Sequence, residues 1–105
     1  MTEAEYNERI EATFADLETA LDEIESDLDY DITGGILTVE FDNGTSMVFS
    51  RQPPSRELWL AARAGGFHFA WDDSEGDWRD TRGGELLRPF VVAQMASQAD
   101  VALEW

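Results

Sequence analysis

The sequence contains no cysteine, no lysine and a single histidine, and each shortage excludes a kind of chemistry. Without cysteine there is no disulfide, no thiolate zinc site and no covalent cysteine intermediate. The lone His68 has no thiol to activate, and the chain has neither a Gly-x-Ser-x-Gly elbow nor a phosphate-binding glycine loop. We therefore expect a protein that is not an enzyme and that leaves any sulfur or redox chemistry to a partner.

Long apolar runs are also missing. No stretch approaches the length of a membrane span, and the N-terminus is acidic where a secretory signal would be basic and apolar. A chain of 105 residues is long enough for one domain with a two-layer core. We expect a single domain over residues 1–105, located in the cytoplasm, with no membrane partner.

Positive charge is scarce, and the formal net charge is −16. A field of that sign repels phosphate, so we expect no nucleic-acid partner and favour a cation or a basic protein surface. The excess of Asp and Glu without any lysine also suggests adaptation to high salt, in which the acidic surface serves solubility. At about 1 M salt the Debye length of ~3 Å would screen such a surface.

The carboxylates are concentrated at one end of the sequence. Residues 1–31 contain twelve acidic side chains against the single Arg9, whereas six of the seven arginines follow residue 50. The protein is therefore polarised, with one strongly anionic end.

The first thirty residues show two successive hydrophobic periods. Thr2 and Glu5 have the spacing of a capping box, and apolar residues then recur every three or four positions, which predicts a helix over about residues 3–25. The period then changes to two, and apolar residues at 28, 30 and 32 alternate with aspartates at 27, 29 and 31. This alternation predicts a short strand that carries three carboxylates on one side. The end of the helix and this strand together would form one acidic ridge.

The remaining sequence predicts antiparallel strands and a closing helix. Turns at Gly34-Gly35 and at Asp42-Asn43-Gly44 separate alternating segments, and further strands are expected at 58–62, 67–71 and around 78–80. Because proline is tolerated only in a first turn, Pro89 places the start of the last helix no earlier than about Leu86. The expected fold class is α+β: a two-layer sandwich with the N- and C-terminal helices packed on one face of an antiparallel sheet of about six strands.

Trp59 is the unusual residue of this pattern. If Leu58 and Leu60 point into the core, the period of two turns Trp59 to the opposite side of the sheet. With both helices on one face, that opposite face is bare, and a large aromatic on it is a candidate for binding a partner.

The ridge offers only carboxylate oxygens, which suit hard cations such as Ca²⁺, Mg²⁺, Mn²⁺ and Fe³⁺. No Asp-x-Asp-x-Asp-Gly calcium loop is present, and carboxylates on a strand share a surface rather than a common centre. We expect such a metal site to be shallow, weak and undiscriminating. A solvated, salt-adapted face is an equally good interpretation of the same residues.

Three motifs in the middle of the chain resemble the frataxin family, in its bacterial CyaY type. They are Arg51-Gln52-x-Pro54, Leu58-Trp59-Leu60-Ala61 and Gly65-Gly66-Phe67-His68-Phe69. Gly34-Gly35-Ile36-Leu37, Asp42-Asn43-Gly44 and the acidic first helix occur in the family's order and spacing, so the likeness spans nearly the whole chain. The resemblance implies the same α+β sandwich.

The resemblance also implies a function in iron-sulfur cluster assembly. The protein would bind iron (Fe²⁺ or Fe³⁺) weakly on its surface and dock on a cysteine desulfurase and its scaffold protein, donating iron or regulating sulfur release. By position, the implied metal residues of the acidic ridge are Glu18, Asp22, Glu23, Glu25, Asp27, Asp29 and Asp31. The implied partner-binding residues are Ser50, Gln52 and Trp59.

Two other interpretations are kept. In the first, the chain is a metal-independent acidic module that docks on a basic partner surface. In the second, it is a ferroxidase with organised iron sites. We expect no organic cofactor and a monomer, with oligomerisation in the presence of iron as the alternative.

Overall fold

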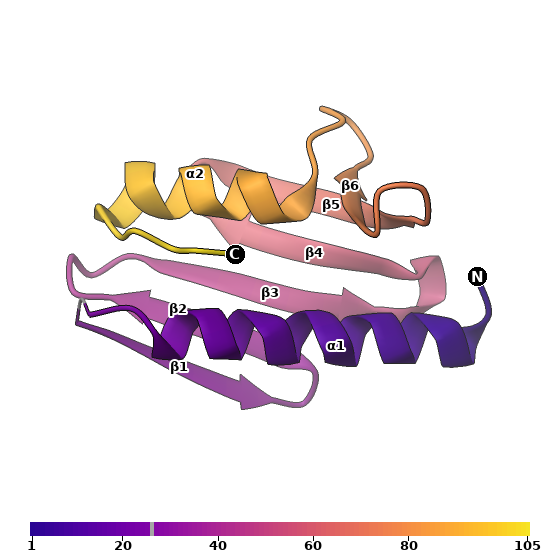
Figure 1. Ribbon diagram of the computed structural model, residues 1–105, viewed down its shortest axis with the longest axis horizontal. Helices are drawn as coiled ribbons and strands as arrows, with labels where there is room; N and C mark the ends of the chain where they lie inside the picture. The colour runs from indigo at the N-terminus through magenta and orange to yellow at the C-terminus, as the bar shows by residue number, and fades with distance from the viewer. Residues whose placement is uncertain (26) are drawn as a thin grey trace.

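The computed structural model describes residues 1–25 and 27–105, and it shows a sheet covered on one side by two helices (Figure 1). The elements, in chain order, are α1 (Glu3–Asp22), β1 (Leu28–Thr33), β2 (Ile36–Phe41), β3 (Ser46–Gln52), a 3-10 turn (Pro53–Ser55), β4 (Glu57–Ala62), β5 (Gly65–Asp72), β6 (Asp77–Asp80) and α2 (Leu87–Ala99).

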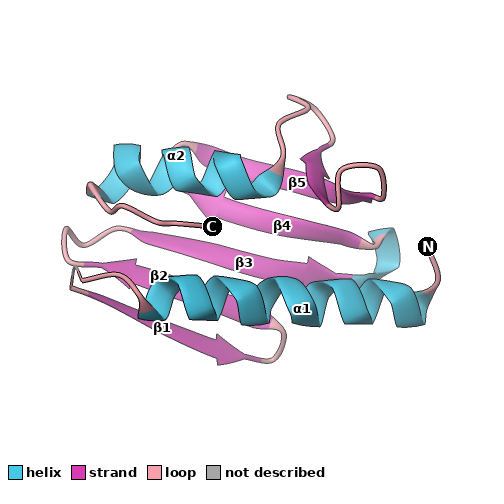
Figure 2. Ribbon diagram, viewed as in Figure 1, coloured by secondary structure: helices cyan, strands magenta, loops and turns pink. Residues whose placement is uncertain are grey.

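The six strands form one antiparallel sheet in the order of the sequence, from β1 at one edge to β6 at the other. Figure 2 shows α1 and α2 side by side in front of this sheet, α1 towards β1 to β3 and α2 towards β4 and β5. The predicted fold class is confirmed, including the placement of both helices on one face. Neither helix in the described part of the chain is long and apolar enough to cross a bilayer.

Helix α1 starts as its sequence predicts. The Thr2 hydroxyl accepts a hydrogen bond from the Glu5 N–H at 3.1 Å, and the Glu5 carboxylate accepts one from the Thr2 N–H at 2.9 Å. These bonds complete the capping box and lower the pKa of Glu5. The buried face of the helix comprises Tyr6, Ile10, Thr13, Phe14, Leu17, Ala20 and Leu21.

The helix ends at Asp22, three residues before the predicted boundary. Its last turn contains no basic side chain, and carboxylates there face the negative end of the helix dipole. The chain closes instead with shorter-range bonds from the Glu23 N–H to the Ala20 carbonyl and from the Ile24 N–H to the Leu21 carbonyl. Glu25 therefore lies in the connection to β1 rather than on the helix.

The inner face of the sheet carries the apolar residues that alternation assigned to it. The buried apolar strand residues are Leu37, Val39, Phe41, Met47, Phe49, Leu58, Leu60, Phe69 and Trp78. Helix α2 begins at Leu87, with Pro89 in its first turn, as predicted. After it the chain returns over the core, where Val101 and Leu103 are buried.

Candidate functional site

The helical part of the acidic ridge ends in a short irregular segment. Glu18 and Asp22 lie on the last two turns of α1, Glu23 caps it, and Glu25 and Asp27 flank the single residue outside the described ranges. All of them are exposed except the half-buried Glu18. These carboxylates are therefore solvated. They can contact a cation, and a cation bound to them would keep most of its hydration shell.

The strand part of the ridge points to the other side of the sheet. Asp29 and Asp31 alternate with Tyr30, which packs against the core, so the two aspartates lie on the face that the helices leave bare. Asp29 is the register partner of Glu40 on β2, and Asp31 is the partner of Thr38. The ridge thus wraps around the β1 edge, with its helical part on the side of the helices and Asp29 and Asp31 on the bare face.

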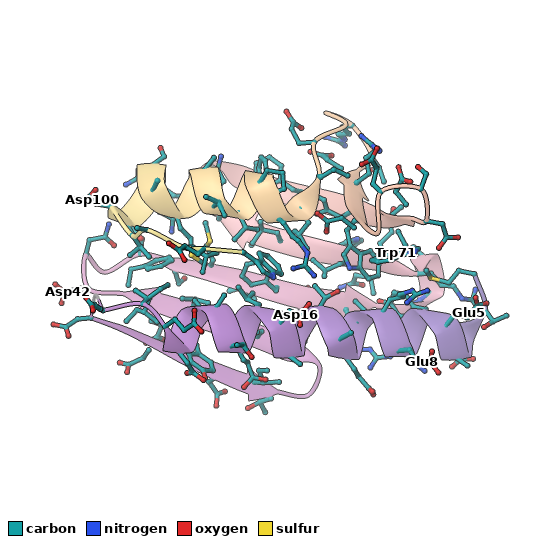
Figure 3. The ribbon with its side chains drawn as sticks, viewed as in Figure 1. Glu5, Glu8, Asp16, Asp42, Trp71 and Asp100 are labelled. Carbon is teal, nitrogen blue, oxygen red and sulfur yellow. The ribbon has the colours of Figure 1, made fainter. Side chains whose placement is uncertain are left out.

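Two shallow hollows lie along this edge. One, of about 250 Å³, is lined by Asp29, Tyr30, Asp31, Thr38 and Glu40. The other, of about 460 Å³, is lined by Asp27, Leu28, Asp29, Glu40, Phe41 and Asp42. Figure 3 shows Asp42 projecting away from the body at this end of the molecule. Asp29 and Glu40 line both hollows and are the centre of the acidic surface on this face.

Tyr30 connects the two parts of the ridge. Its hydroxyl donates a hydrogen bond of 2.5 Å to the Asp22 carboxylate at the end of α1. This bond, with the negative charges of Asp22 and Glu18 nearby, raises the pKa of Tyr30 to about 12. One oxygen of Asp22 is therefore already engaged, and β1 is fixed to the helix end.

The arrangement provides carboxylates without a coordination sphere. Among residues 1–25 and 27–105, no three His, Cys, Asp or Glu side chains are placed to hold one metal ion together. A cation at this edge would be held by one or two carboxylates and complete its shell with water, which is how Mg²⁺-like hard ions bind protein surfaces. The geometry fits weak binding of hard cations and offers little discrimination among them.

The second candidate surface lies across the middle of the bare face. Ser50, Trp59 and His68 are register neighbours on β3, β4 and β5, so their side chains form one row. Trp59 is half-buried, because the His68 ring stacks on its indole with centroids 4.1 Å apart and an interplanar angle of 4°. The Trp59 indole N–H donates to the Glu57 carboxylate at 2.9 Å. The tryptophan is thus on the predicted face, but its pose is fixed by two neighbours.

Gln52, the remaining predicted docking residue, lies at the end of the same surface. Its N–H donates to the Tyr6 hydroxyl at 2.9 Å, and that hydroxyl donates to the Glu57 carbonyl at 2.6 Å. Burial raises the pKa of Tyr6, so the phenol keeps its proton. Arg51 packs over the Tyr6 ring, with its guanidinium carbon 5.7 Å from the ring centroid, and its guanidinium is hydrogen-bonded to Asn7.

Sequence reasoning missed Glu40 and Tyr30 as members of these surfaces. Glu40 could have been found, because the two-residue Gly34-Gly35 turn fixes the hairpin register and so places Glu40 opposite Asp29. The hydrogen bonds of Tyr30 and Glu57 depend on side-chain rotamers, for which the sequence carries no signal.

Three comparisons bear on this chain. The family model of the Frataxin-like domain matches residues 1–101. Two relatives named Iron-sulfur cluster assembly protein CyaY, from Pseudomonas fluorescens and Pseudomonas entomophila, are 43% and 47% identical over 105 residues, covering 100% of this chain and 96% of each relative.

Solved structures agree with these relatives. A frataxin from Psychromonas ingrahamii, described as a member of the CyaY protein family, superposes with a TM-score of 0.90 at 30% identity and covers 99% of this chain and 97% of its own. A trimeric frataxin from the yeast Saccharomyces cerevisiae, complexed with ferrous iron, has a TM-score of 0.61 at 25% identity, over 95% of this chain and 88% of its own.

Proposed function

This chain belongs to the frataxin family, and from that membership we propose that it acts in iron-sulfur cluster assembly. In this role it binds iron weakly at the β1 edge and docks on a cysteine desulfurase and its scaffold protein, donating iron or regulating sulfur release. Relatives that are named Iron-sulfur cluster assembly protein CyaY match this chain over 96% and 99% of their own length. We propose that it has no catalytic activity of its own and works in the cytoplasm as one domain.

The observation that carries the iron proposal is the gathering of carboxylates around one sheet edge. Carboxylates from the end of α1, from the following loop and from β1 meet there, and Glu40 joins them from β2. Oxygen-only ligands select hard cations, and partial coordination makes binding weak and reversible. A donor that must release its iron to a partner needs that property.

A titration with Fe²⁺ under anaerobic conditions tests the iron site. At about 0.1 M salt, where the Debye length is roughly 10 Å, amide resonances of residues 18–31 and of Glu40 should broaden first. The paired change Asp29→Asn with Glu40→Gln should abolish the strongest broadening. A matched pair at the opposite end of α1, Glu3→Gln with Glu8→Gln, removes the same charge and should leave it unchanged. Uniform broadening, or equal effects of both pairs, would mean that the ridge is only a solvated acidic face.

The second candidate function is a metal-independent docking module, and the Trp59 row favours it. An indole stacked on a histidine on a bare sheet face is a preformed anchor of the kind that dominates protein interfaces. Trp59→Ala should abolish binding to the desulfurase and leave the Fe²⁺ titration unchanged. If binding survives that change and is lost only when ridge charges are reversed, the contact is mainly electrostatic.

We propose a monomer in the absence of iron. The trimeric yeast relative complexed with ferrous iron makes oligomerisation with iron the alternative. Sedimentation velocity with and without Fe²⁺ distinguishes the two, since only the alternative gives a larger species when iron is added.

A stopped-flow assay of Fe²⁺ oxidation tests the ferroxidase hypothesis, which requires an oxidation rate above that of buffer alone.

A further inference from the structure

A side chain of α1 completes the hydrogen bonding at one end of the sheet. Gln52 and Glu57 are the last register pair of the β3–β4 ladder, just before the turn at Pro53–Ser55. The Tyr6 hydroxyl accepts from the N–H of Gln52 and donates to the carbonyl of Glu57. The two strands are therefore linked at this point through a phenol that belongs to the helix layer.

The Tyr6 hydroxyl is held rigidly. The side chain is 0% exposed, its ring meets the Trp78 ring edge to face with centroids 6.0 Å apart, and Arg51 lies over it. The turn that it braces ends at Arg56, whose φ of 52° is in the left-handed region that costs a non-glycine residue. The Tyr6 hydroxyl is hydrogen-bonded to Gln52 before the turn and to Glu57 after it. These two bonds stabilise the left-handed conformation of Arg56, which is unfavourable by itself.

Glu57 extends this bridge to the bare face. Its carbonyl is bound by Tyr6, and its carboxylate accepts the hydrogen bond of the Trp59 indole. Trp59 in turn stacks on His68. A continuous series of contacts thus runs from the helix layer, around the end of the β3–β4 ladder, to the aromatic row on the other side of the sheet.

We propose that Tyr6 is a positioning residue for this aromatic row: by holding the Glu57 backbone, its hydroxyl sets the orientation in which the Trp59 indole is presented to a partner. The consequence for desulfurase docking rests on the proposed function, whereas the effect on Trp59 itself does not. The inference needs no contact between Tyr6 and the partner.

The test compares Tyr6→Phe with a matched control, Tyr30→Phe, which removes the chain's only other phenol hydroxyl. In Tyr6→Phe the Gln52 amide should exchange with solvent about five- to tenfold faster, the effect of losing one hydrogen bond. The indole N–H resonance of Trp59, assigned from a Trp59→Phe spectrum, should shift by more than its line width. Tyr30→Phe should change neither signal.

The outcomes separate this inference from the proposed function. An unchanged Trp59 resonance in folded Tyr6→Phe overturns the positioning role. If Tyr6→Phe fails to fold, 3-fluorotyrosine in the Tyr30→Phe background labels Tyr6 alone and makes its hydroxyl a stronger donor. A shifted Trp59 resonance then supports the inference, and an unchanged one overturns it.

Binding to the desulfurase is then measured for the wild type and for Tyr6→Phe. A five- to tenfold loss of affinity supports positioning for docking, and equal affinities overturn that part. If the wild type does not bind at all, the proposed function fails, while a shifted Trp59 resonance still supports the positioning of the indole.

Discussion

At the scale of single residues, Thr13 shows how the core keeps a buried polar group paired. Its hydroxyl donates to the Arg9 carbonyl at 2.7 Å and accepts the hydrogen bond of the Trp78 indole N–H at 2.8 Å. Trp78 is 0% exposed, so its N–H cannot turn to water. The pair joins α1 to β6 across 65 residues of the sequence.

Thr13→Val should therefore destabilise the protein. Valine keeps the shape of threonine but leaves the Trp78 N–H buried without an acceptor, which costs about 1–3 kcal/mol. Thr19→Val is the matched control, because exposed Thr19 makes the same bond to the carbonyl four residues back, at 3.1 Å, and accepts no hydrogen bond from any other described residue. Urea unfolding measures both free energies, and equal losses for the two variants would show that the Trp78 bond contributes nothing.

Tyr30 gives the fold a dependence on alkaline pH. Its pKa is about 12 in the folded protein against an ordinary value of 10.0, because the Asp22 carboxylate holds the phenol protonated. The stabilisation is fully present below pH 10 and is lost as the pH rises through 12. Because burial also raises the pKa of Tyr6, the test is the difference between the ultraviolet tyrosinate titrations of wild type and Tyr30→Phe, and this difference should have its midpoint near 12. A wild-type midpoint near 10 for Tyr30 would mean that its bond to Asp22 does not persist in solution.

At the scale of elements, α2 depends on a cap from outside its own sequence. Leu86 at its N-cap offers no side-chain hydrogen bond, and the Asp77 carboxylate from β6 accepts from the Arg88 N–H at 3.1 Å instead. Asp77 is buried and also accepts from the Trp78 N–H at 2.8 Å. The start of α2 is thus stabilised only when β6 is in place.

Asp77→Ala should cost about 1–2 kcal/mol of unfolding free energy, the loss of a helix cap with its buried partners left unpaired. Asp16→Ala serves as control, because Asp16 forms an exposed ion pair of 2.8 Å with Arg88, and such pairs contribute less than about 1 kcal/mol. Chemical denaturation of both variants measures whether Asp77→Ala loses more unfolding free energy than Asp16→Ala. A larger loss from Asp16 would assign the stabilisation of Arg88 to the ion pair rather than to the cap.

The contrast between local and distant contacts also explains what the sequence could predict. The capping box of Thr2 and Glu5, the apolar stripe of α1 and the outward side of Trp59 all follow from residues a few positions apart. The cap of α2 by Asp77 joins residues 11 positions apart in different elements, and the bridge from Tyr6 spans 46 and 51 positions. Neither follows a helical or strand period, so no local pattern encodes them. The acidic ridge lies between these cases: its cluster of carboxylates is visible in the sequence, but the position of Glu40 beside Asp29 and the wrapping around the β1 edge depend on the pairing of β1 with β2.

At the scale of the whole molecule, the dominant feature is a net charge of −16 with few compensating ion pairs among the described residues. Like charges on a compact body repel each other, and that repulsion opposes folding until salt screens it. The short pairs Arg79–Asp72 and Arg88–Asp16 work in the opposite direction, because salt weakens them.

Repulsion should prevail, since sixteen charges remain uncompensated. We expect the urea midpoint of unfolding to rise as KCl increases from about 0.1 to about 1 M, over which the Debye length falls from roughly 10 to 3 Å. NaCl at the same ionic strength is the control and should act equally if screening is the cause. A midpoint that falls with salt would show that the attractive pairs dominate, and it would count against salt adaptation.

The order of the strands has a consequence for how the chain folds. Each strand pairs with its neighbour in sequence, so the sheet can assemble from successive hairpins with short loop closures. The bonds of Tyr6 span 46 and 51 residues, so α1 closes much larger loops when it docks. If α1 docks after the rate-limiting step, weakening its contacts should speed unfolding and leave the folding rate nearly unchanged. Stopped-flow chevrons of Ile10→Val in α1 and of Met47→Ala in β3 measure both rates. We expect Ile10→Val to change only the unfolding rate. A slower folding rate for Ile10→Val would instead show that α1 is already docked in the folding nucleus.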